Sequence, residues 1–214
     1  MPNLRTQPYI WTTWLSKLLG GDSSCEWSTW YRAHHENISK RDRSDMDGWR
    51  LKHTALLNKT KAMFEKEGSK VFLEDQNKFS LYGAVATLAG KPDLIVASDD
   101  GYLICDVKSG QSKMADRMQV MIYMFAIPLA LPRYKNVSFS GMLAYDGHHD
   151  YISAEDVDEA FTSGLVSLIK RVGGAEPAQR VPSVRECRFC DLTAESCDAR
   201  IEEEEEVGCV TDVF

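Results

Sequence analysis

The fold of this 214-residue chain is decided by one stretch of sequence, Gly90-Lys-Pro-Asp-Leu-Ile-Val-Ala-Ser-Asp-Asp-Gly-Tyr-Leu-Ile-Cys-Asp-Val-Lys108. Two apolar runs rich in β-branched residues flank Asp100-Gly101, and this arrangement is the strongest short signal of a β-hairpin. If those two residues form the turn, Asp99 faces Tyr102, and the numbers of paired residues sum to 201. The stretch therefore predicts two antiparallel strands joined by a tight turn.

This register gathers charged side chains at one end of the hairpin. Ile95 faces Asp106 and Asp93 faces Lys108, and alternation puts all four on one face with Asp93 diagonal to Asp106. Two carboxylates a few ångströms apart repel each other unless a cation lies between them. Oxygen ligands suit Mg²⁺ or Mn²⁺, and a nearby lysine can orient a water; a simple Asp–Lys surface ion pair is the alternative. The other face is expected to contact the core and carries Leu94, Val96, Leu103, Cys105 and Val107.

Composition and element order bound the fold class. The chain has 25 basic and 32 acidic side chains, a net charge of −7 and 43% hydrophobic residues, which excludes a wholly disordered or collagen-like chain. No apolar run is long enough to span a bilayer and no secretory signal is present, so we expect a cytoplasmic protein without membrane contact. Helices before and after a group of strands predict a mixed α/β (α+β) fold. Expected helices cover 9–19, 25–35, 46–67 (with Asp45 as N-cap), 113–131 and 154–172, and expected strands cover 71–73, 79–82, 84–88, 94–98, 102–107 and 137–145.

The order Pro92-Asp93 and then Asp-x-Lys on the next strand resembles the PD-(D/E)XK nuclease superfamily, and the thirteen-residue separation of Asp93 from Asp106 resembles its RecB-like branch. That branch has a metal-binding histidine on a preceding helix, which His53 matches, and a Gln-x-x-x-Tyr pair on the following helix. Gln119 and Tyr123 match this pair, and their spacing puts both on one face of that helix. The resemblance implies a restriction-endonuclease-like core, with a central mixed sheet flanked by helices.

The resemblance also implies roles for these residues. His53, Asp93, Asp106 and the Val107 carbonyl are expected to hold one or two Mg²⁺ or Mn²⁺ ions. Lys108 is expected to orient the attacking water and to offset charge on the phosphorus. Gln119 and Tyr123 are expected to position substrate or water.

The chain has six cysteines, and a cytosolic chain argues against disulfides. Cys187 and Cys190 form a C-x₂-C motif that Cys197 follows; with Cys25 beside the N-terminal helices, they make the four ligands of a Cys₄ site. Such a site would tie together the two ends of the chain. Cys105 is expected to be a small buried hydrophobe, and Cys209 a free thiol in the tail.

This cysteine arrangement resembles the CRISPR-associated RecB-like exonucleases, the fourth of the Cas series. The resemblance implies a 4Fe–4S cluster on Cys25, Cys187, Cys190 and Cys197. It also implies 5′→3′ exonuclease activity on single-stranded DNA and a role with integrase proteins in preparing spacer precursors. The thiolate count alone leaves zinc open. Two features depart from the family pattern: Asp instead of Glu at position 106, and the acidic run Glu202–Glu206.

We therefore expect one nuclease domain over residues 1–200, made of an N-terminal helical part (1–70), a nuclease core (71–175) and a cluster-binding segment (176–200), followed by an acidic tail (201–214). Two alternatives stay open: a DNA repair or phage recombination nuclease with the same core, and a non-catalytic DNA-binding scaffold with a Cys₄ zinc staple. A basic cluster permits a polyanion ligand, and Trp27, Trp30 and Tyr31 beside it could stack bases or serve packing. The cluster comprises Lys40, Arg41, Arg43, Arg50 and Lys52.

Overall fold

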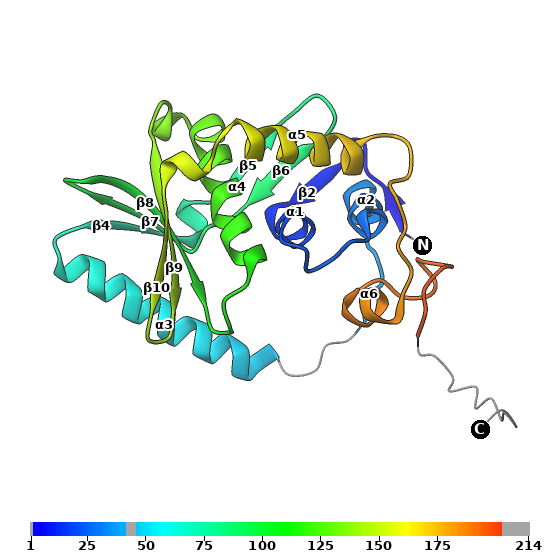
Figure 1. Ribbon diagram of the computed structural model, residues 1–214, viewed down its shortest axis with the longest axis horizontal. Helices are drawn as coiled ribbons and strands as arrows, with labels where there is room; N and C mark the ends of the chain where they lie inside the picture. Colours follow the sequence, from blue (N-terminus) through cyan, green and yellow to red (C-terminus); the bar gives the residue numbers. More distant parts are fainter. Residues whose placement is uncertain (1, 42–45, 203–214) are drawn as a thin grey trace, which may run out of the picture.

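The computed structural model describes residues 2–41 and 46–202 of the chain (Figure 1). Asp45, Arg43, Cys209 and most of the acidic tail lie outside these ranges. The helices are α1 Thr12–Leu19, α2 Glu26–His34, α3 Met46–Lys66, α4 Met114–Ala130, α5 Glu159–Gly173 and α6 Val184–Phe189. The strands are β1 Asn3–Leu4, β2 Tyr9–Trp11, β3 His35–Glu36, β4 Lys70–Leu73, β5 Phe79–Tyr82, β6 Thr87–Gly90, β7 Leu94–Ser98, β8 Gly101–Lys108, β9 Phe139–Tyr145 and β10 His149–Ile152.

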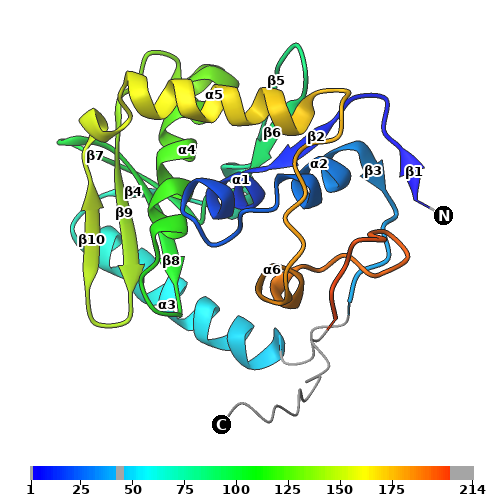
Figure 2. The same ribbon diagram turned by 45° about the vertical axis from the view of Figure 1, so that its right-hand side comes forward.

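The mixed α/β fold that the sequence predicts is confirmed. The central sheet has five strands in the order β10-β9-β8-β7-β4, in which β8 and β9 are parallel and the other neighbours antiparallel. Helix α3 lies along one face of this sheet, and α4 lies on the other, between the sheet and α1 (Figures 1 and 2). A second sheet, β2-β6-β5, lies beyond α4, and β1 pairs with β3 near the N-terminus. No described helix is long and apolar enough to cross a membrane.

The hairpin forms, but its turn is displaced by one residue from the prediction. Ser98 pairs with Gly101, so Asp99 and Asp100 form the turn and the paired numbers sum to 199. Gly101 has a φ of 122°, a conformation that glycine adopts readily and other residues rarely do. Gly101 is therefore the first paired residue of β8 and is not one of the two turn residues.

This displacement brings the two carboxylates closer than the prediction did. Leu94 pairs with Cys105, so the next position along the register places Asp93 opposite Asp106 rather than opposite Lys108. Each residue changes its partner by two positions, which leaves it on the predicted face because side chains alternate with a period of two.

Both faces of the hairpin are buried, although the sequence predicts only one of them as core. The predicted apolar face packs against α3, and Cys105 is fully buried there, as expected. The opposite face contributes Ile95 and Ile104 to the larger core around α4. The charged end of the hairpin is consequently enclosed by helices from two sides.

Several element boundaries differ from the predictions. The segment expected to be helical over 9–19 begins with strand β2, because residues 9–11 pair in parallel with β6. The strand expected over 84–88 is β6 at 87–90. The last long helix begins at Glu159 rather than Ala154, since Asp158 caps it by accepting the Phe161 N–H at 2.7 Å. Strand β10 and helix α6 were not predicted.

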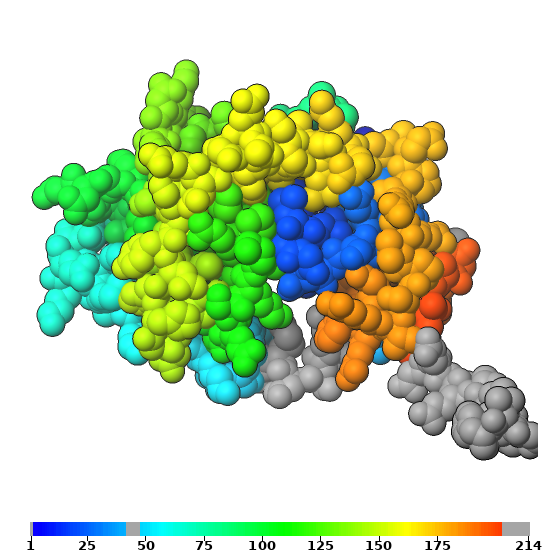
Figure 3. All heavy atoms as spheres, in the orientation of Figure 1, coloured from blue at the N-terminus to red at the C-terminus, as the bar shows by residue number. Residues whose placement is uncertain are grey.

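The C-terminal segment lies against the N-terminal helices. The Trp27 amide donates to the Gln179 carbonyl at 2.9 Å, and Lys40 forms an isolated bridge with Leu192. The guanidinium of Arg32 pairs with the Asp191 carboxylate at 2.7 Å. Figure 3 shows this segment in orange beside the blue N-terminal residues. Segments far apart in the sequence are therefore joined on this side of the molecule.

Candidate functional site

The charged end of the hairpin is a connected polar site. Asp93 directly precedes β7, and its Oδ2 accepts the Val107 amide at 2.8 Å. Asp106 is 3% exposed, and its Oδ2 lies 2.8 Å from Lys108 Nζ. The strand end thus holds both carboxylates and the ammonium in fixed positions, as the sequence predicts.

Helix α3 adds His53 to this site. Its Nε2 lies 3.3 Å from Asp93 Oδ2, and the Trp49 ring stacks on the imidazole with ring centroids 5.2 Å apart. The hydrogen bond to Asp93 raises the pKa of His53, and burial partly offsets this. His53 therefore reaches the carboxylates from the side of the sheet opposite α4.

Helix α4 closes the other side with Gln119 and Tyr123. Gln119 Oε1 accepts from Lys108 Nζ at 3.0 Å, and its Nε2 donates to Tyr123 Oη at 3.0 Å and to Asp106 Oδ1 at 3.3 Å. The Tyr123 hydroxyl donates in turn to the Lys91 carbonyl at 3.4 Å. A Cβ on Gly90 would lie 2.7 Å from the Tyr123 ring, so only glycine lets this ring approach the chain just before Pro92-Asp93.

Burial and mutual repulsion shape the charges of the site. Burial raises the pKa of Asp106 to about 6; Lys108 opposes this shift and Asp93 reinforces it. Burial lowers the pKa of Lys108, but the carboxylates of Asp106, Asp116 and Asp93 together raise it by more, so the net pKa lies above its usual value. Two carboxylates, an imidazole and one ammonium leave a negative site in which a divalent cation would relieve the repulsion.

The donor set fits a hard divalent cation. Carboxylate oxygens and an imidazole nitrogen are donors that Mg²⁺ and Mn²⁺ accept. Across residues 2–41 and 46–202, however, no three side chains of His, Cys, Asp or Glu stand ready around one metal position. His53 Nε2 and Asp93 Oδ2 contact each other directly at 3.3 Å, so a cation bound by both would replace this contact.

Sequence reasoning missed two residues at this site. Asp116 Oδ1 lies 3.4 Å from Lys108 Nζ, and the Tyr145 hydroxyl donates to Asp116 Oδ2 at 3.2 Å. Asp116 stands three residues before Gln119 on the same helix, a spacing that could have indicated it. Tyr145 pairs with Lys108 across the parallel β8–β9 ladder, which the sequence does not specify.

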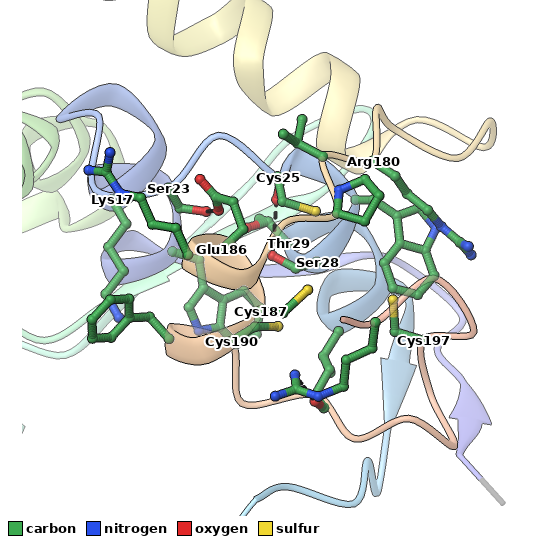
Figure 4. Close-up of a pocket in the computed structure, with 18 of the residues that line it drawn as sticks. Lys17, Ser23, Cys25, Ser28, Thr29, Arg180, Glu186, Cys187, Cys190 and Cys197 are labelled. Carbon is green, nitrogen blue, oxygen red and sulfur yellow. Dashed lines mark hydrogen bonds between the residues drawn. The ribbon is translucent and has the colours of Figure 1, made fainter. Parts of the chain in front are cut away.

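The four cysteines of the predicted cluster line a single cavity of about 400 Å³ (Figure 4). Cys25 directly precedes α2, Cys187 lies in α6, Cys190 follows α6, and Cys197 lies further along the C-terminal segment. Burial raises the pKa of Cys190, which Arg32 opposes, and burial raises the pKa of Cys197, which Arg180 opposes. Four thiols are ligands of the type that zinc or an iron–sulfur cluster takes, although among the described residues no three of them stand around one position.

Packing interactions hold this cavity together from outside. Glu186 of α6 accepts hydrogen bonds from the Ser23 hydroxyl and the Ser24 amide, both at 2.8 Å. The guanidinium of Arg180 lies over the Trp27 ring at 4.0 Å, and Trp30 Nε1 donates to the Gly174 carbonyl at 2.9 Å. The tryptophans of α2 therefore have packing roles here.

The model of the PD-(D/E)XK nuclease superfamily matches residues 22–198, a range that includes the polar site and all four cysteines of the cavity. A search of curated proteins finds no match. A solved structure titled "Crystal structure of SSO0001" aligns with a TM-score of 0.49 and 14% identity, over 88% of this chain and 85% of that chain. At these values the alignment carries no argument about function.

Proposed function

Because the chain belongs to the PD-(D/E)XK nuclease superfamily, we propose that it is a metal-dependent exonuclease that degrades single-stranded DNA in the 5′→3′ direction. Membership of the superfamily implies metal-dependent nuclease activity. The exonuclease mode, the DNA substrate, the single-strand preference and the polarity go further, and they are supported by the resemblance to RecB-like exonucleases.

One observation carries the nuclease assignment. The six predicted side chains form two groups of polar contacts that meet at the end of β8, although they come from α3, the hairpin and α4. His53 contacts Asp93, which accepts the Val107 amide, and the neighbouring residues Asp106 and Lys108 contact each other and Gln119, which donates to Tyr123. Burying several polar and charged groups together costs stability. Such a set is therefore expected where it serves a purpose other than stability. A scaffold protein would have no reason to keep this set at one place.

The residues divide the proposed reaction between them. His53, Asp93, Asp106 and the Val107 carbonyl would hold Mg²⁺ or Mn²⁺, which supplies Lewis-acid polarisation of the phosphate and lowers the pKa of a bound water. Lys108 carries a permanent positive charge at neutral pH, so it offsets charge that develops on the phosphate oxygens. Gln119 fixes that ammonium through Oε1 and fixes Asp106 through Nε2.

We also propose that the four cysteines hold a 4Fe–4S cluster that joins the chain ends. The shared cavity supports this assignment, and Arg32 and Arg180 partly oppose the effect of burial, which raises the pKa of Cys190 and Cys197. We further propose that residues 1–200 act as one domain, and that its task is to prepare DNA ends for CRISPR spacer integration with integrase partners. The cysteine arrangement is what supports the CRISPR role.

The test uses protein purified without air and single strands labelled at the 5′ or the 3′ end. With Mn²⁺ or Mg²⁺, the wild type should release the 5′ label first. Lys108→Ala should lower the rate by about 10³-fold or more, because the positioned ammonium is lost. Lys59→Ala is the matched control and should cut normally, since Lys59 is exposed and, in the described part of the chain, pairs with Asp146 at 3.4 Å.

The outcomes separate the alternatives. Undiminished cleavage by both Lys108→Ala and Asp106→Ala would refute the assigned site, and a metal-loaded wild type that does not cut would favour a scaffold. A colourless, zinc-loaded and active protein would retain the nuclease and remove the cluster. Co-purification with repair or recombination proteins instead of integrase would replace the CRISPR role.

A further inference from the structure

The ammonium of Lys108 has two carboxylate partners, of which the proposed mechanism uses only one. We propose that Asp116, held in place by Tyr145, is a positioning residue that fixes Lys108 for the reaction. This inference rests on the proposed nuclease function and adds to it a pair of residues outside the PD-(D/E)XK motif and the Gln-x-x-x-Tyr pair.

The two oxygens of Asp116 have different partners. Oδ1 faces Lys108 Nζ at 3.4 Å, and Oδ2 accepts the Tyr145 hydroxyl at 3.2 Å. The Asp116 side chain is 16% exposed, so both contacts are partly shielded from water, which would otherwise screen them. A carboxylate with one oxygen fixed by a hydroxyl presents the other in a defined direction.

Tyr145 is itself rigidly placed. It is 2% exposed, stands beside Lys108 in the parallel β8–β9 ladder, and stacks on His148 with ring centroids 4.6 Å apart and planes 9° apart. The sheet that carries Lys108 therefore also carries the hydroxyl that orients its second carboxylate. Helix α4 contributes Asp116 and Gln119 to the same ammonium from successive turns.

The geometry also explains why a second carboxylate is useful. Asp106 faces Lys108 at 2.8 Å, but it is also one of the expected metal ligands, so its charge is shared between two cations. Gln119 contributes a neutral acceptor at 3.0 Å. Among the described residues, the Asp116 carboxylate contacts Lys108 and Tyr145 and neither His53 nor Asp93, so Lys108 is the cation that it pairs with. The 3.4 Å separation is the longest of the three, which leaves one N–H of the ammonium able to turn toward water or phosphate.

The test compares steady-state kinetics of the metal-loaded wild type with those of Asp116→Asn, Tyr145→Phe and the double variant. Asp116→Asn should lower kcat about tenfold with KM for DNA unchanged, because misplacing a catalytic group costs rate rather than binding. Tyr145→Phe should lower kcat about threefold. The double variant should match Asp116→Asn, since Tyr145 acts only through Asp116.

Two controls separate positioning from other roles. Asp146→Asn removes one negative charge at the same end of the sheet, where the side chain is 86% exposed and pairs with Lys59, and it should leave kcat unchanged. The rise in melting temperature on adding Mn²⁺ should be the same for Asp116→Asn and wild type. Loss of that rise would make Asp116 a metal ligand and overturn the proposal.

Other results would also overturn the positioning role. These are a wild-type kcat for Asp116→Asn, a rise in KM with kcat unchanged, or decreases in kcat that add up in the double variant. If the wild type cuts and Lys108→Ala does not, these results refute only the role of Asp116. A wild type that does not cut refutes the proposed function and the positioning role with it.

Discussion

The polar site and the cysteine cavity are built in opposite ways. The polar site takes its residues from one hairpin and the two helices that enclose it, and each of its side chains contacts another polar group of the protein. The cysteine cavity takes its thiols from distant parts of the chain, and the hydrogen bonds and ion pair that hold these parts together involve other residues that surround the thiols. The first site is organised by the fold, whereas the second is expected to depend on what it binds.

The largest effect should come from removing one thiol of the cavity. Cys190→Ser should lose the bound iron and lower the melting temperature by about 10 °C, because a metal that cross-links distant segments contributes several kcal/mol. The measurements are iron content and thermal unfolding under anaerobic conditions. The polar site should keep its metal-dependent thermal shift in this variant.

Cys105→Ala is the matched control for this experiment. Its thiol is fully buried in the apolar cluster under α3 and lies outside the cavity, so iron content should be unchanged. If Cys190→Ser retained full iron and melted like the wild type, the cysteine cavity would not depend on a cluster held by this thiol. The contrast between the two sites would then be wrong.

A smaller effect should follow from neutralising Asp106 in the metal-free protein. Burial raises the pKa of Asp106 to about 6, against 3.8 for the ordinary group. The folded protein therefore binds a proton that the unfolded chain releases, and its stability falls as pH rises from about 4 to about 6. An asparagine has no such charge, so Asp106→Asn should melt about 3 °C above the wild type at pH 8.

The same variant should behave differently toward metal and pH. At pH 5 its advantage over the wild type should shrink, because Asp106 is then largely protonated. Adding Mn²⁺ should stabilise the wild type but not Asp106→Asn, as differential scanning fluorimetry would measure. A variant that melts below the wild type at pH 8 without metal would show that the Lys108 contact outweighs the cost of burying the charge.

The contrast between the sites also explains what the sequence could predict. Asp93, Asp106 and Lys108 follow from the alternation of one hairpin. Gln119 and Tyr123 are indicated by the resemblance to RecB-like nucleases, and their helical spacing puts them on one face. These rules operate over a few residues, so they survive the one-residue error in the turn. The error concerns the place of the glycine. An Asp-Gly pair can form both residues of a turn, or its glycine can follow the turn with a positive φ, as Gly101 does, and the dipeptide alone does not decide between the two.

The missed features depend on partners distant in the sequence. Tyr145 reaches Lys108 only through the parallel pairing of β8 and β9, which α4 separates along the chain. Helix α6 has six residues, too few to be stable by its own propensity, and packing against the N-terminal segment accounts for it. Strand β2 likewise exists because β6 pairs with it. Local patterns could not specify these contacts.

The smallest predicted effect concerns Tyr123. It tests whether the hydrogen bonds that hold the polar site in place depend on the hydroxyl of this residue. Tyr123→Phe removes a hydroxyl that accepts from Gln119 and donates to Lys91, but Gln119 keeps its contacts with Lys108 and Asp106. We therefore expect kcat to fall only about two- to threefold, with little change in melting temperature.

The matched control for this hydroxyl is Tyr134→Phe. Tyr134 is also 2% exposed, but among the described residues its hydroxyl has no hydrogen-bond partner, so its removal should change neither kcat nor stability. Gln119→Ala supplies the upper limit, because it removes the contacts to both Lys108 and Asp106. If Tyr123→Phe lost as much activity as Gln119→Ala, the hydroxyl would have to contact the substrate or the attacking water itself. Tyr123 would then be a catalytic residue. The hydrogen bonds that only position other groups would end at Gln119 on α4.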